Sequence, residues 1–369
     1  MSGTVLLAAG GTGGHLFPAE ALAIALAQRG VQVELATDDR ALRYGGAFPA
    51  SAVHTIASAT PRGGSVLGKV MAAFTLAQGT LSAWMLLRAR RPSCVIGFGG
   101  YPTVPPVLAA SLLGIPTIIH DQNAVLGKAN RFLSGRVSAI ACGFPNLGGV
   151  SQALRARVNV TGNPVRPAVI DAATTPFPDT ADGRLRLLVT GGSQGAKVMS
   201  DIVPAAIELL SPTLRARLVI VQQARGEDEE RVRAAYQSMS LAAEVAPFFK
   251  DLPNRIAQAH LVIARSGAST VSELAVIGRP SILVPFPFAL DQDQAANARE
   301  LAQTGAAQII KQDQFSPEWL AARLEAAMNE PESLRAQAAA AKAAGVPDAA
   351  DRLADLVMSV MARATEKSS

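Results

Sequence analysis

Two segments of this chain, far apart in the sequence, share one design: an apolar run of strand length, a glycine-rich turn, and a run of helical character. The first, "TVLLAAGGTGGHLFPAEALAIAL", begins at residue 4, and the second, "LRLLVTGGSQGAKVMSDIVPAAIELL", begins at residue 185. A chain that repeats a strand, turn and helix in this way is expected to build two α/β domains. The matched positions are Gly10 and Gly191, Gly11 and Gly192, Thr12 and Ser193, and Gly14 and Gly195.

The alternation of strand-like and helical runs continues along the whole chain, which indicates βαβ units with parallel sheets. The 369 residues suffice for two domains with separate cores. A segment rich in Pro, Thr, Asp and Gly at 160–183 is typical of an interdomain linker. We expect two Rossmann-like parallel-sheet domains facing each other across a cleft, and a final helix at about 348–365 whose partner the residues do not reveal. In the first domain we expect a helix from Pro18 to Arg29, ended by Gly30 in a left-handed turn.

Composition and charge narrow the class of protein. The net charge is +5, but no dense Arg/Lys block with interleaved aromatic residues occurs, so we predict no nucleic-acid partner. Cys94 and Cys142 lie in apolar runs without metal-ligand spacing, which is typical of buried residues in a reducing compartment. The N-terminus lacks the basic leader of a signal peptide, and prolines and a glycine break the apolar stretch 103–119. We therefore expect a cytoplasmic protein without a membrane span.

The two glycine-rich turns sit where open α/β sheets bind ligands, after a parallel strand and before a helix. Glycine lets backbone N–H groups approach an anion, and the helix dipole favours negative charge there. Turn geometry alone also explains one such cluster, but two matched clusters favour a phosphorylated ligand. Neither turn fits the dinucleotide fingerprint or the P-loop, which disfavours an oxidoreductase or an NTPase. His15, at the start of the first helix, can either bind phosphate or act as a base.

Three further polar clusters are candidates for the site. In "RSGASTVSELAVIG", Glu273 follows Thr270 by one helical turn, so it can accept both hydroxyls of a ribose or complete a capping box. In "HDQN", His120 to Asn123 end a predicted strand at the carboxyl edge of the sheet. Asp291 and Asp293 form a D-x-D pair, but carboxylates at a polar helix start usually cap the helix, so we predict no metal site.

One long helical segment, from Arg62 to Arg91, carries more apolar surface than a single contact with a sheet requires. Cations lie around it, which suits shallow attachment to an anionic membrane surface. Packing in the core explains most apolar helix faces equally well. The apolar positions are Val66, Leu67, Val70, Met71 and Phe74, and the cations are Arg62, Lys69, Arg88, Arg90 and Arg91.

Taken together, the motifs resemble those of the N-acetylglucosaminyltransferases that convert lipid I to lipid II in peptidoglycan synthesis. The resemblance covers nearly the whole chain, and it rests on the order of several motifs rather than on one glycine turn. These motifs are "GGTGGHLFPA", "GFGGYPTVPPVLAA", "HDQNAVLGKANRFL", "GNPVR", "TGGSQGA", "RSGASTVSE" and "DQDQAANA".

This resemblance implies the GT-B fold, without a cofactor. It implies an N-terminal acceptor and membrane-association domain at 1–163, a UDP-sugar domain at 164–347, and a last helix at about 348–369 packed on the first domain. The implied reaction is an inverting transfer of N-acetylglucosamine from UDP-N-acetylglucosamine to the C4 hydroxyl of the muramyl sugar of lipid I, at the cytoplasmic face of the inner membrane.

The resemblance also implies the site residues. Glu273 would hold the ribose, Gln294 the transferred sugar, and the backbone at Phe249 the uracil. The implied contacts to the donor sugar or diphosphate are Thr12, Gly13, Gly14, Asn123, Arg166 and Ser193, and those to diphosphate and ribose are Ala268, Ser269, Thr270, Val271, Ser272 and Glu273.

Two departures from the family pattern bear on the site. Where the family usually has "HEQN" this chain has "HDQN", so a base role is less secure for Asp121, which is one methylene shorter. Asp293 stands where glutamine or histidine is common. We therefore expect His15 to be the base and Asp121 the second candidate. Rival hypotheses are a UDP-sugar 2-epimerase and a membrane-surface protein that binds the nucleotide sugar without chemistry.

Overall fold

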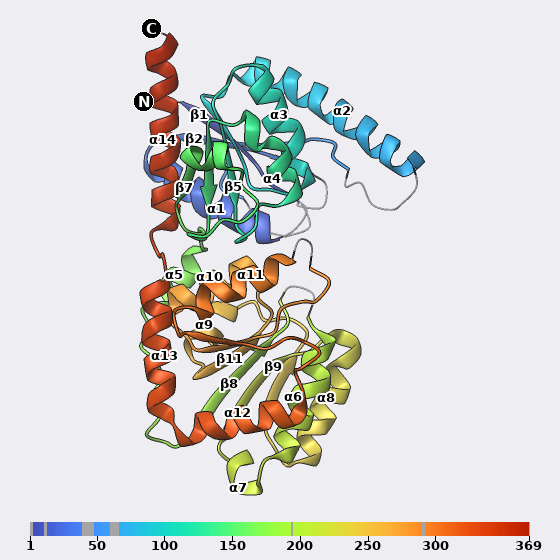
Figure 1. The fold of residues 1–369 in the computed structure, drawn as a ribbon, viewed down its shortest axis with the longest axis vertical. Helices are drawn as coiled ribbons and strands as arrows, with labels where there is room; N and C mark the ends of the chain where they lie inside the picture. Colours follow the sequence, from blue (N-terminus) through green and yellow to red (C-terminus); the bar gives the residue numbers. More distant parts are fainter. Residues whose placement is uncertain are drawn as a thin grey trace. The chain divides into compact units, whose positions relative to one another are not determined.

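The computed structural model describes residues 3–10, 13–38, 48–59, 66–192, 195–289 and 292–368, apart from the side chains at 66–67 and 367–368. The chain divides into two compact units (Figure 1). Unit 1 comprises Met1–Arg166 and Pro347–Ser369, and unit 2 comprises Pro167–Val346. The chain therefore passes from one unit to the other twice.

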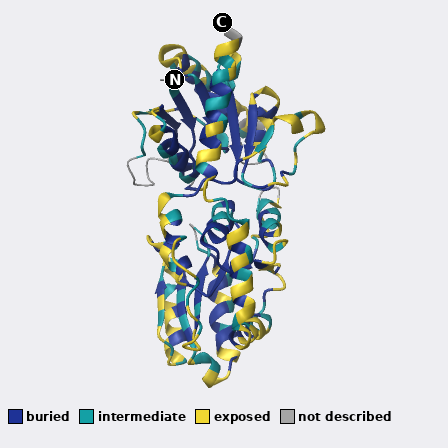
Figure 2. Ribbon diagram, turned by 90° about the vertical axis from the view of Figure 1, so that its left-hand side faces the viewer, coloured by how far each residue is buried: buried dark blue, intermediate teal, exposed yellow. Residues whose placement is uncertain are grey.

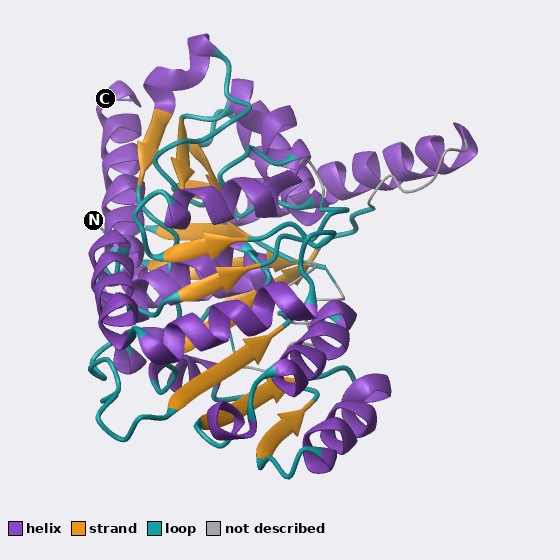
Figure 3. Ribbon diagram, turned by 60° about the horizontal axis from the view of Figure 1, so that its bottom comes forward, coloured by secondary structure: helices purple, strands orange, loops and turns teal. Residues whose placement is uncertain are grey.

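Unit 1 is built on a parallel sheet with the strand order β3-β2-β1-β4-β5-β6-β7. Helices lie on both faces of the strands (Figure 3). The strands are β1 (Thr4–Ala8), β2 (Gln32–Thr37), β3 (Ala52–Thr55), β4 (Cys94–Gly97), β5 (Thr117–Asp121), β6 (Ala139–Cys142) and β7 (Val158–Val160). The helices are α1 (Gly13–Gln28), α2 (Val66–Arg90), α3 (Val104–Leu112), α4 (Lys128–Leu133) and α14 (Ala349–Ser368).

Unit 2 has a second parallel sheet, with the strand order β10-β9-β8-β11-β12-β13. The two parallel-sheet α/β domains that the sequence predicted are thus confirmed. The strands are β8 (Leu185–Thr190), β9 (Leu218–Gln223), β10 (Ala243–Ala246), β11 (Leu261–Ala264), β12 (Ser281–Leu283) and β13 (Ala307–Ile309). The helices are α5 (Pro167–Ala172), α6 (Lys197–Leu209), α7 (Pro212–Arg215), α8 (Gly226–Ser238), α9 (Leu252–Ala257), α10 (Ala268–Ile277), α11 (Asp293–Ala302), α12 (Pro317–Asn329) and α13 (Pro331–Ala344).

Helix α1 begins earlier than the sequence predicted. It starts at Gly13, so Pro18 lies inside the helix rather than in its first turn. A proline lacks the N–H that would bond the carbonyl four residues back, so the helix gives up one backbone bond there and continues. Gly30 follows the helix with φ 73°, as predicted for a left-handed residue at the helix end. The early start places Gly13, Gly14 and His15 in the first turn.

The core of unit 1 follows the two-residue period of its strands. On β1, Val5 and Leu7 point into one apolar layer, while Leu6 points into the other. The first layer contains side chains of α1 and α14, and the second contains side chains of α3 and of the C-terminal part of α2. Strands buried on both faces read as continuous apolar runs, and the strands of both sheets are accordingly mostly dark blue in Figure 2.

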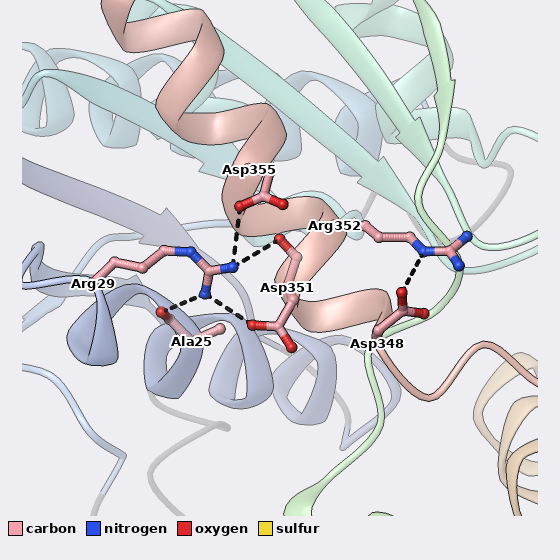
Figure 4. Close-up of polar contacts among 6 residues, drawn as sticks. All are labelled: Ala25, Arg29, Asp348, Asp351, Arg352 and Asp355. Atoms are coloured by element: carbon pink, nitrogen blue, oxygen red, sulfur yellow. Dashed lines mark hydrogen bonds and ion pairs between the residues drawn. The ribbon is translucent and has the colours of Figure 1, made fainter.

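The last helix, α14, packs against α1 in unit 1. Leu353 and Val357 on α14 are fully buried in the layer shared with α1. Arg29, just after α1, donates to Asp351 at 2.9 Å and to Asp355 at 3.0 Å, and Figure 4 shows its guanidinium between the two carboxylates. Apolar burial fixes the helix against the sheet, and the charged contacts lie at its rim.

Replacing the buried side chain should therefore cost much more than replacing the charged one. We expect Leu353→Ala to lower the free energy of unfolding by about 2–5 kcal/mol, because it leaves a cavity in the core. Arg29→Ala should cost about 1 kcal/mol or less, because both partner carboxylates are more than half exposed. Urea denaturation followed by circular dichroism measures both, with Arg29→Lys as a control. Equal losses in the two variants would contradict this assignment.

Candidate functional site

The loops of unit 1 converge at the carboxyl ends of three neighbouring strands. In the sheet, β4 lies between β1 and β5, and all three are parallel. The segments that follow these strands therefore leave from one edge of the sheet. They bring together His15, the pair Gly99 and Gly100, and Gln122. The site residues that the sequence predicted near the first glycine turn and in "HDQN" thus lie at one edge of unit 1.

His15 is held by one ring nitrogen and by close backbone. Its Nδ1 lies 3.1 Å from Oε1 of Gln122. The other edge of the ring faces Gly99 and Gly100, whose φ angles are +86° and +72°. A Cβ atom on Gly100 would stand 3.2 Å from Nε2 of His15. Glycine at this position thus both permits the left-handed backbone and leaves room beside Nε2.

Behind His15, a buried polar chain continues into the sheet. Nε2 of Gln122 lies 3.0 Å from Nδ1 of His120, and Nε2 of His120 lies 3.1 Å from the carbonyl oxygen of Gly162. His120 is fully buried and Gln122 nearly so. Burial lowers the pKa of His120 to about 4, so its ring is neutral at pH 7. His120, which the sequence analysis placed only at a strand end, is thus a neutral residue inside the fold.

Asp121 organises the loop that follows β5. Its carboxylate accepts hydrogen bonds from the backbone N–H of Asn123 at 3.1 Å, from that of Gly127 at 2.8 Å, and from the side-chain amide of Asn130 at 3.0 Å. Burial raises the pKa of Asp121, and these hydrogen bonds oppose the rise. A carboxylate that ends a strand and accepts the amides of its own loop fixes the shape of that loop.

The other predicted residues of unit 1 lie nearby in the sequence order but differ in setting. Gly13 is buried and Gly14 exposed in the first turn of α1. The guanidinium of Arg166 stacks on the ring of Phe17, a residue of α1, at 4.4 Å. Thr12, the hydroxyl residue of the first glycine turn, lies outside the described residues.

In unit 2 the second glycine turn is clamped by Gln223, a residue that sequence analysis missed. Its Oε1 accepts from Thr190 Oγ1 at 2.9 Å and from the backbone N–H of Gly191 at 3.0 Å. Its Nε2 donates to the carbonyls of Gly192 at 3.0 Å and Pro247 at 3.1 Å. The signal was a buried glutamine at the end of the apolar strand β9, beside the strand that leads into the turn. Ser193 of this turn lies outside the described residues.

The start of α10 differs from a capping box. Its N-cap residue is Gly267, which has no side chain to cap the helix, and Thr270 lies in the helix itself. The alternative in which Thr270 caps the helix together with Glu273 is therefore wrong. Ser269 and Thr270 are partly exposed in the first turn, while Glu273 is buried. The helix thus begins as an N-terminus that can accept an anion, as the predicted diphosphate site requires. The remaining predicted residues of this stretch, Ala268, Val271 and Ser272, lie in α10 as well.

Gln294 ties the start of α11 to two loops. Its side-chain oxygen accepts from the backbone N–H of Phe286 at 2.9 Å, and its carbonyl accepts from Ser266 Oγ at 2.8 Å. Asp293 accepts the N–H of Gln294 at 2.7 Å. Within the described ranges no group of three or more His, Cys, Asp or Glu residues is placed to hold a metal ion; Asp291 lies outside those ranges.

Phe249 lies in the loop between β10 and α9, where it is nearly buried, and the guanidinium of Arg255 stacks on its ring at 4.2 Å. The bond from Gln223 to Pro247 connects this loop to the glycine turn. Three of the segments predicted to contact the donor are therefore positioned by hydrogen bonds or stacking within unit 2 alone: the glycine turn, the loop at Phe249 and the start of α11.

Helix α2 exposes a single apolar stripe. At 100° per residue its exposed apolar side chains span about 100° of the helix circumference. The N-terminal part of the helix projects away from the rest of unit 1 (Figure 1). The segment Gly68–Arg90 is long and apolar enough to cross a membrane, by length and composition only. The stripe, named here by its exposed fractions, consists of Val70 (58%), Met71 (61%), Phe74 (61%), Leu81 (60%) and Met85 (55%).

The cations around α2 have two fates. Arg90 donates through Nε to the buried carboxylate of Glu34 at 2.9 Å, which turns it inward. The expectation that Arg90 belongs to the cationic fringe is therefore wrong, because a buried carboxylate binds it. Arg88 stacks on the ring of Trp84 at 4.8 Å. Arg62 lies outside the described residues, as do the side chains of Val66 and Leu67.

Comparison with known proteins gives a consistent result over the whole chain. Residues 5–142 match the "Glycosyltransferase family 28 N-terminal domain", and residues 186–353 match the "Glycosyltransferase family 28 C-terminal domain". A curated relative from Rhodopseudomonas palustris is 56% identical over 361 residues, which are 98% of this chain and 96% of the relative. It is named UDP-N-acetylglucosamine--N-acetylmuramyl-(pentapeptide) pyrophosphoryl-undecaprenol N-acetylglucosamine transferase. A relative of the same name from Methylorubrum extorquens is 59% identical over 96% of each chain.

Solved structures agree in fold. The crystal structure of Acinetobacter baumannii MurG has a TM-score of 0.78 at 33% identity and covers 97% of this chain and 99% of its own. A UDP-GlcNAc 2-epimerase from Neisseria meningitidis has a TM-score of 0.66 at 14% identity, covering 97% and 100%. At 14% identity the likeness to the epimerase concerns the fold alone.

The neutral state of His120 predicts how stability depends on pH. In the unfolded chain a histidine takes up its proton near pH 6.5, whereas folded His120 does so near pH 4. Between these values the unfolded chain binds more protons, so lowering the pH from 7 to 5 should cost about 2 kcal/mol through this side chain. In His120→Gln the loss between pH 7 and 5, measured by urea denaturation, should be smaller by about that amount. An unchanged pH dependence would contradict the buried neutral ring.

Proposed function

The chain belongs to glycosyltransferase family 28, and we propose that it transfers N-acetylglucosamine from UDP-N-acetylglucosamine to lipid I, the undecaprenyl-diphosphate-linked muramyl pentapeptide, to form lipid II. The family is the one that the ordered sequence motifs predicted. The observation that carries the proposal is the identity of 56–59% with relatives that bear one and the same transferase name, over nearly the full length of both chains.

The reaction is a single displacement at the anomeric carbon. The C4 hydroxyl oxygen of the muramyl sugar forms a bond to that carbon, and the bond from the carbon to the diphosphate oxygen of UDP breaks. The electron pair of the broken bond leaves with UDP, and the hydroxyl proton passes to a base. Inversion follows because the attack and the departure occur on opposite faces of the carbon.

His15 is the base in this proposal. Its Nδ1 is engaged by Gln122, while its Nε2 edge lies beside the two glycines after β4, where backbone without side chains leaves space for a sugar. Asp121 is the weaker candidate, because its two oxygens already accept three hydrogen bonds from the loop after β5. A carboxylate used in this way supports the site rather than taking the proton.

Unit 2 binds the donor in this proposal. Charge that develops on the leaving diphosphate is met by backbone N–H groups of the glycine turn and of the α10 N-terminus. Glu273 accepts the ribose hydroxyls, and Gln294 contacts the transferred sugar. The hydrogen bonds of Gln223 hold the turn in shape before the donor arrives, so little ordering is needed at the moment of reaction. Gly13, Gly14, Asn123, Arg166 and the residues outside the described ranges, Thr12 and Ser193, remain proposed donor contacts.

The stripe on α2 is proposed to lie on the anionic cytoplasmic leaflet, where a lipid-linked acceptor is reached. Ala83 and Leu87, on the opposite face, are buried against the rest of unit 1, and Arg90 is bound to Glu34. A helix bound on one face by its own domain suits shallow insertion of the other face rather than a span. The partner is thus an anionic membrane surface, with peripheral attachment.

Two rivals are separated by one assay. A 2-epimerase would convert UDP-N-acetylglucosamine without an acceptor, and a binding protein would retain it unchanged. With labelled donor and a water-soluble lipid I analogue, transfer of label to the analogue supports the proposal. Epimerised donor without transfer, or binding without turnover, would overturn it.

His15→Ala should lower kcat about 10²–10⁴-fold, because the acceptor hydroxyl loses its base. The affinity for UDP should change much less, because the donor is held mainly by unit 2. The matched control is His54→Gln, a second partly exposed histidine of unit 1 that pairs with Glu34 away from the site. Transfer assays and UDP titration measure the two effects. Near-normal turnover of His15→Ala at saturating acceptor would rule out the base assignment.

The double variant Met71→Glu/Phe74→Glu should bind poorly to vesicles that contain an anionic lipid, because it places charge in the apolar stripe of α2. Its turnover with the water-soluble acceptor analogue should stay near that of the unchanged protein. Leu209→Glu, at an exposed apolar position on α6 in unit 2, is the control and should leave vesicle binding intact. Vesicle sedimentation measures binding. Equal sedimentation of both variants would contradict the membrane role of α2.

A further inference from the structure

A line of hydrogen bonds connects His15 to the interior of unit 1 through two side chains whose burial needs an explanation. From the inside outward it runs from the carbonyl of Gly162 to His120, then to Gln122, then to Nδ1 of His15, with heavy-atom distances of 3.1, 3.0 and 3.1 Å. Polar side chains are costly to bury, and apolar ones would fill the same space at lower cost. The arrangement of donors and acceptors along the line suggests what this cost supports.

The direction of every bond in the line is fixed by its inner end. The Gly162 carbonyl can only accept, so Nε2 of His120 must carry a proton. The ring is neutral and has a single N–H, so its Nδ1 has a lone pair and accepts. Only the amide nitrogen of Gln122 can donate to it, which turns the amide oxygen toward His15. This oxygen accepts, so Nδ1 of His15 carries the proton.

We propose that His120 and Gln122 are positioning residues that hold neutral His15 in the tautomer with its proton on Nδ1, so that the lone pair on Nε2 faces the acceptor hydroxyl. Free histidine in water favours the opposite tautomer, with the proton on Nε2. In that form the nitrogen beside Gly100 could not take a proton. The inference rests on the proposed base role of His15, and it adds how the fold prepares that base.

The surroundings of Nε2 fit this assignment. Among the described residues none is hydrogen-bonded to Nε2, and the nearest backbone is that of the glycine pair after β4. The charged group that acts on His15 is the buried carboxylate of Asp121. That carboxylate is engaged by its own loop and therefore does not replace the amide of Gln122 at Nδ1. An amide can orient the neutral ring without the full negative charge that would hold it protonated.

Nitrogen-15 NMR of the full-length protein tests the tautomer directly. The chain has four histidines, so labelling histidine alone gives few signals, and the His15 signals are assigned by their loss in His15→Gln. At pH 8 we expect a pyrrole-type shift for Nδ1 of His15 and a pyridine-type shift for Nε2. The reverse pattern in the unchanged protein would overturn the proposal without any variant.

Gln122→Met removes both hydrogen bonds at similar side-chain volume. We expect the His15 signals to move toward the tautomer with the proton on Nε2, and kcat to fall about 10²-fold, as for other bases held in the wrong tautomer. KM for UDP-N-acetylglucosamine should change less than about threefold, because the donor is held mainly elsewhere. Gln122→Glu, whose carboxylate can still accept from Nδ1, should restore the Nδ1-protonated signal and shift the basic form of His15 to higher pH in the rate profile.

The outcomes separate this inference from the proposed function. If Gln122→Met leaves the tautomer of His15 unchanged in a protein with native circular dichroism, the positioning role is wrong, whatever the activity of His15→Ala. If the tautomer switches in Gln122→Met while His15→Ala keeps its turnover, the positioning role stands and the base role fails.

Discussion

The pairing of β4 between β1 and β5 is the constraint on which the site of unit 1 depends. Because the three strands are parallel and hydrogen-bonded in this order, three segments distant in the sequence start from one edge of the sheet, about 5 Å apart. His15 and Gln122 meet across that edge, with Gly100 between them. A one-residue slip of β5 would turn Gln122 to the opposite face, so the fixed register of the buried sheet is also what selects the partner of His15.

Each unit stiffens its ligand-binding edge with one buried polar side chain that makes several hydrogen bonds. In unit 1 the carboxylate of Asp121 accepts three donors of a single loop, and in unit 2 the amide of Gln223 joins the glycine turn to the segment at Pro247. Burying one polar group is costly, but several bonds to backbone offset that cost. Loops fixed in this way present N–H groups and ring nitrogens in set directions before a substrate binds, which is the condition for electrostatic catalysis.

The sequence predicted the two parallel sheets and the strand ends that carry the site, because glycine turns and apolar runs are local signals. It missed Gln223 and the line behind His15, because the partner of a buried side chain depends on which strands are neighbours. Pro18 misplaced the start of α1, since a proline tolerated inside a helix looks the same in sequence as one at its first turn. Arg90 was assigned to the surface, since nothing in its own helix reveals the buried Glu34 that binds it.

The shorter side chain in "HDQN" follows from the same geometry. An aspartate at the end of a strand can accept the N–H two residues on, as Asp121 does with Asn123, and here its second oxygen also reaches Gly127 and Asn130. A side chain one methylene longer would move both oxygens outward and could keep all three bonds only if the loop moved too. The position after His120 therefore shapes the loop, and the residue that follows it, Gln122, is the one whose side chain reaches the proposed base.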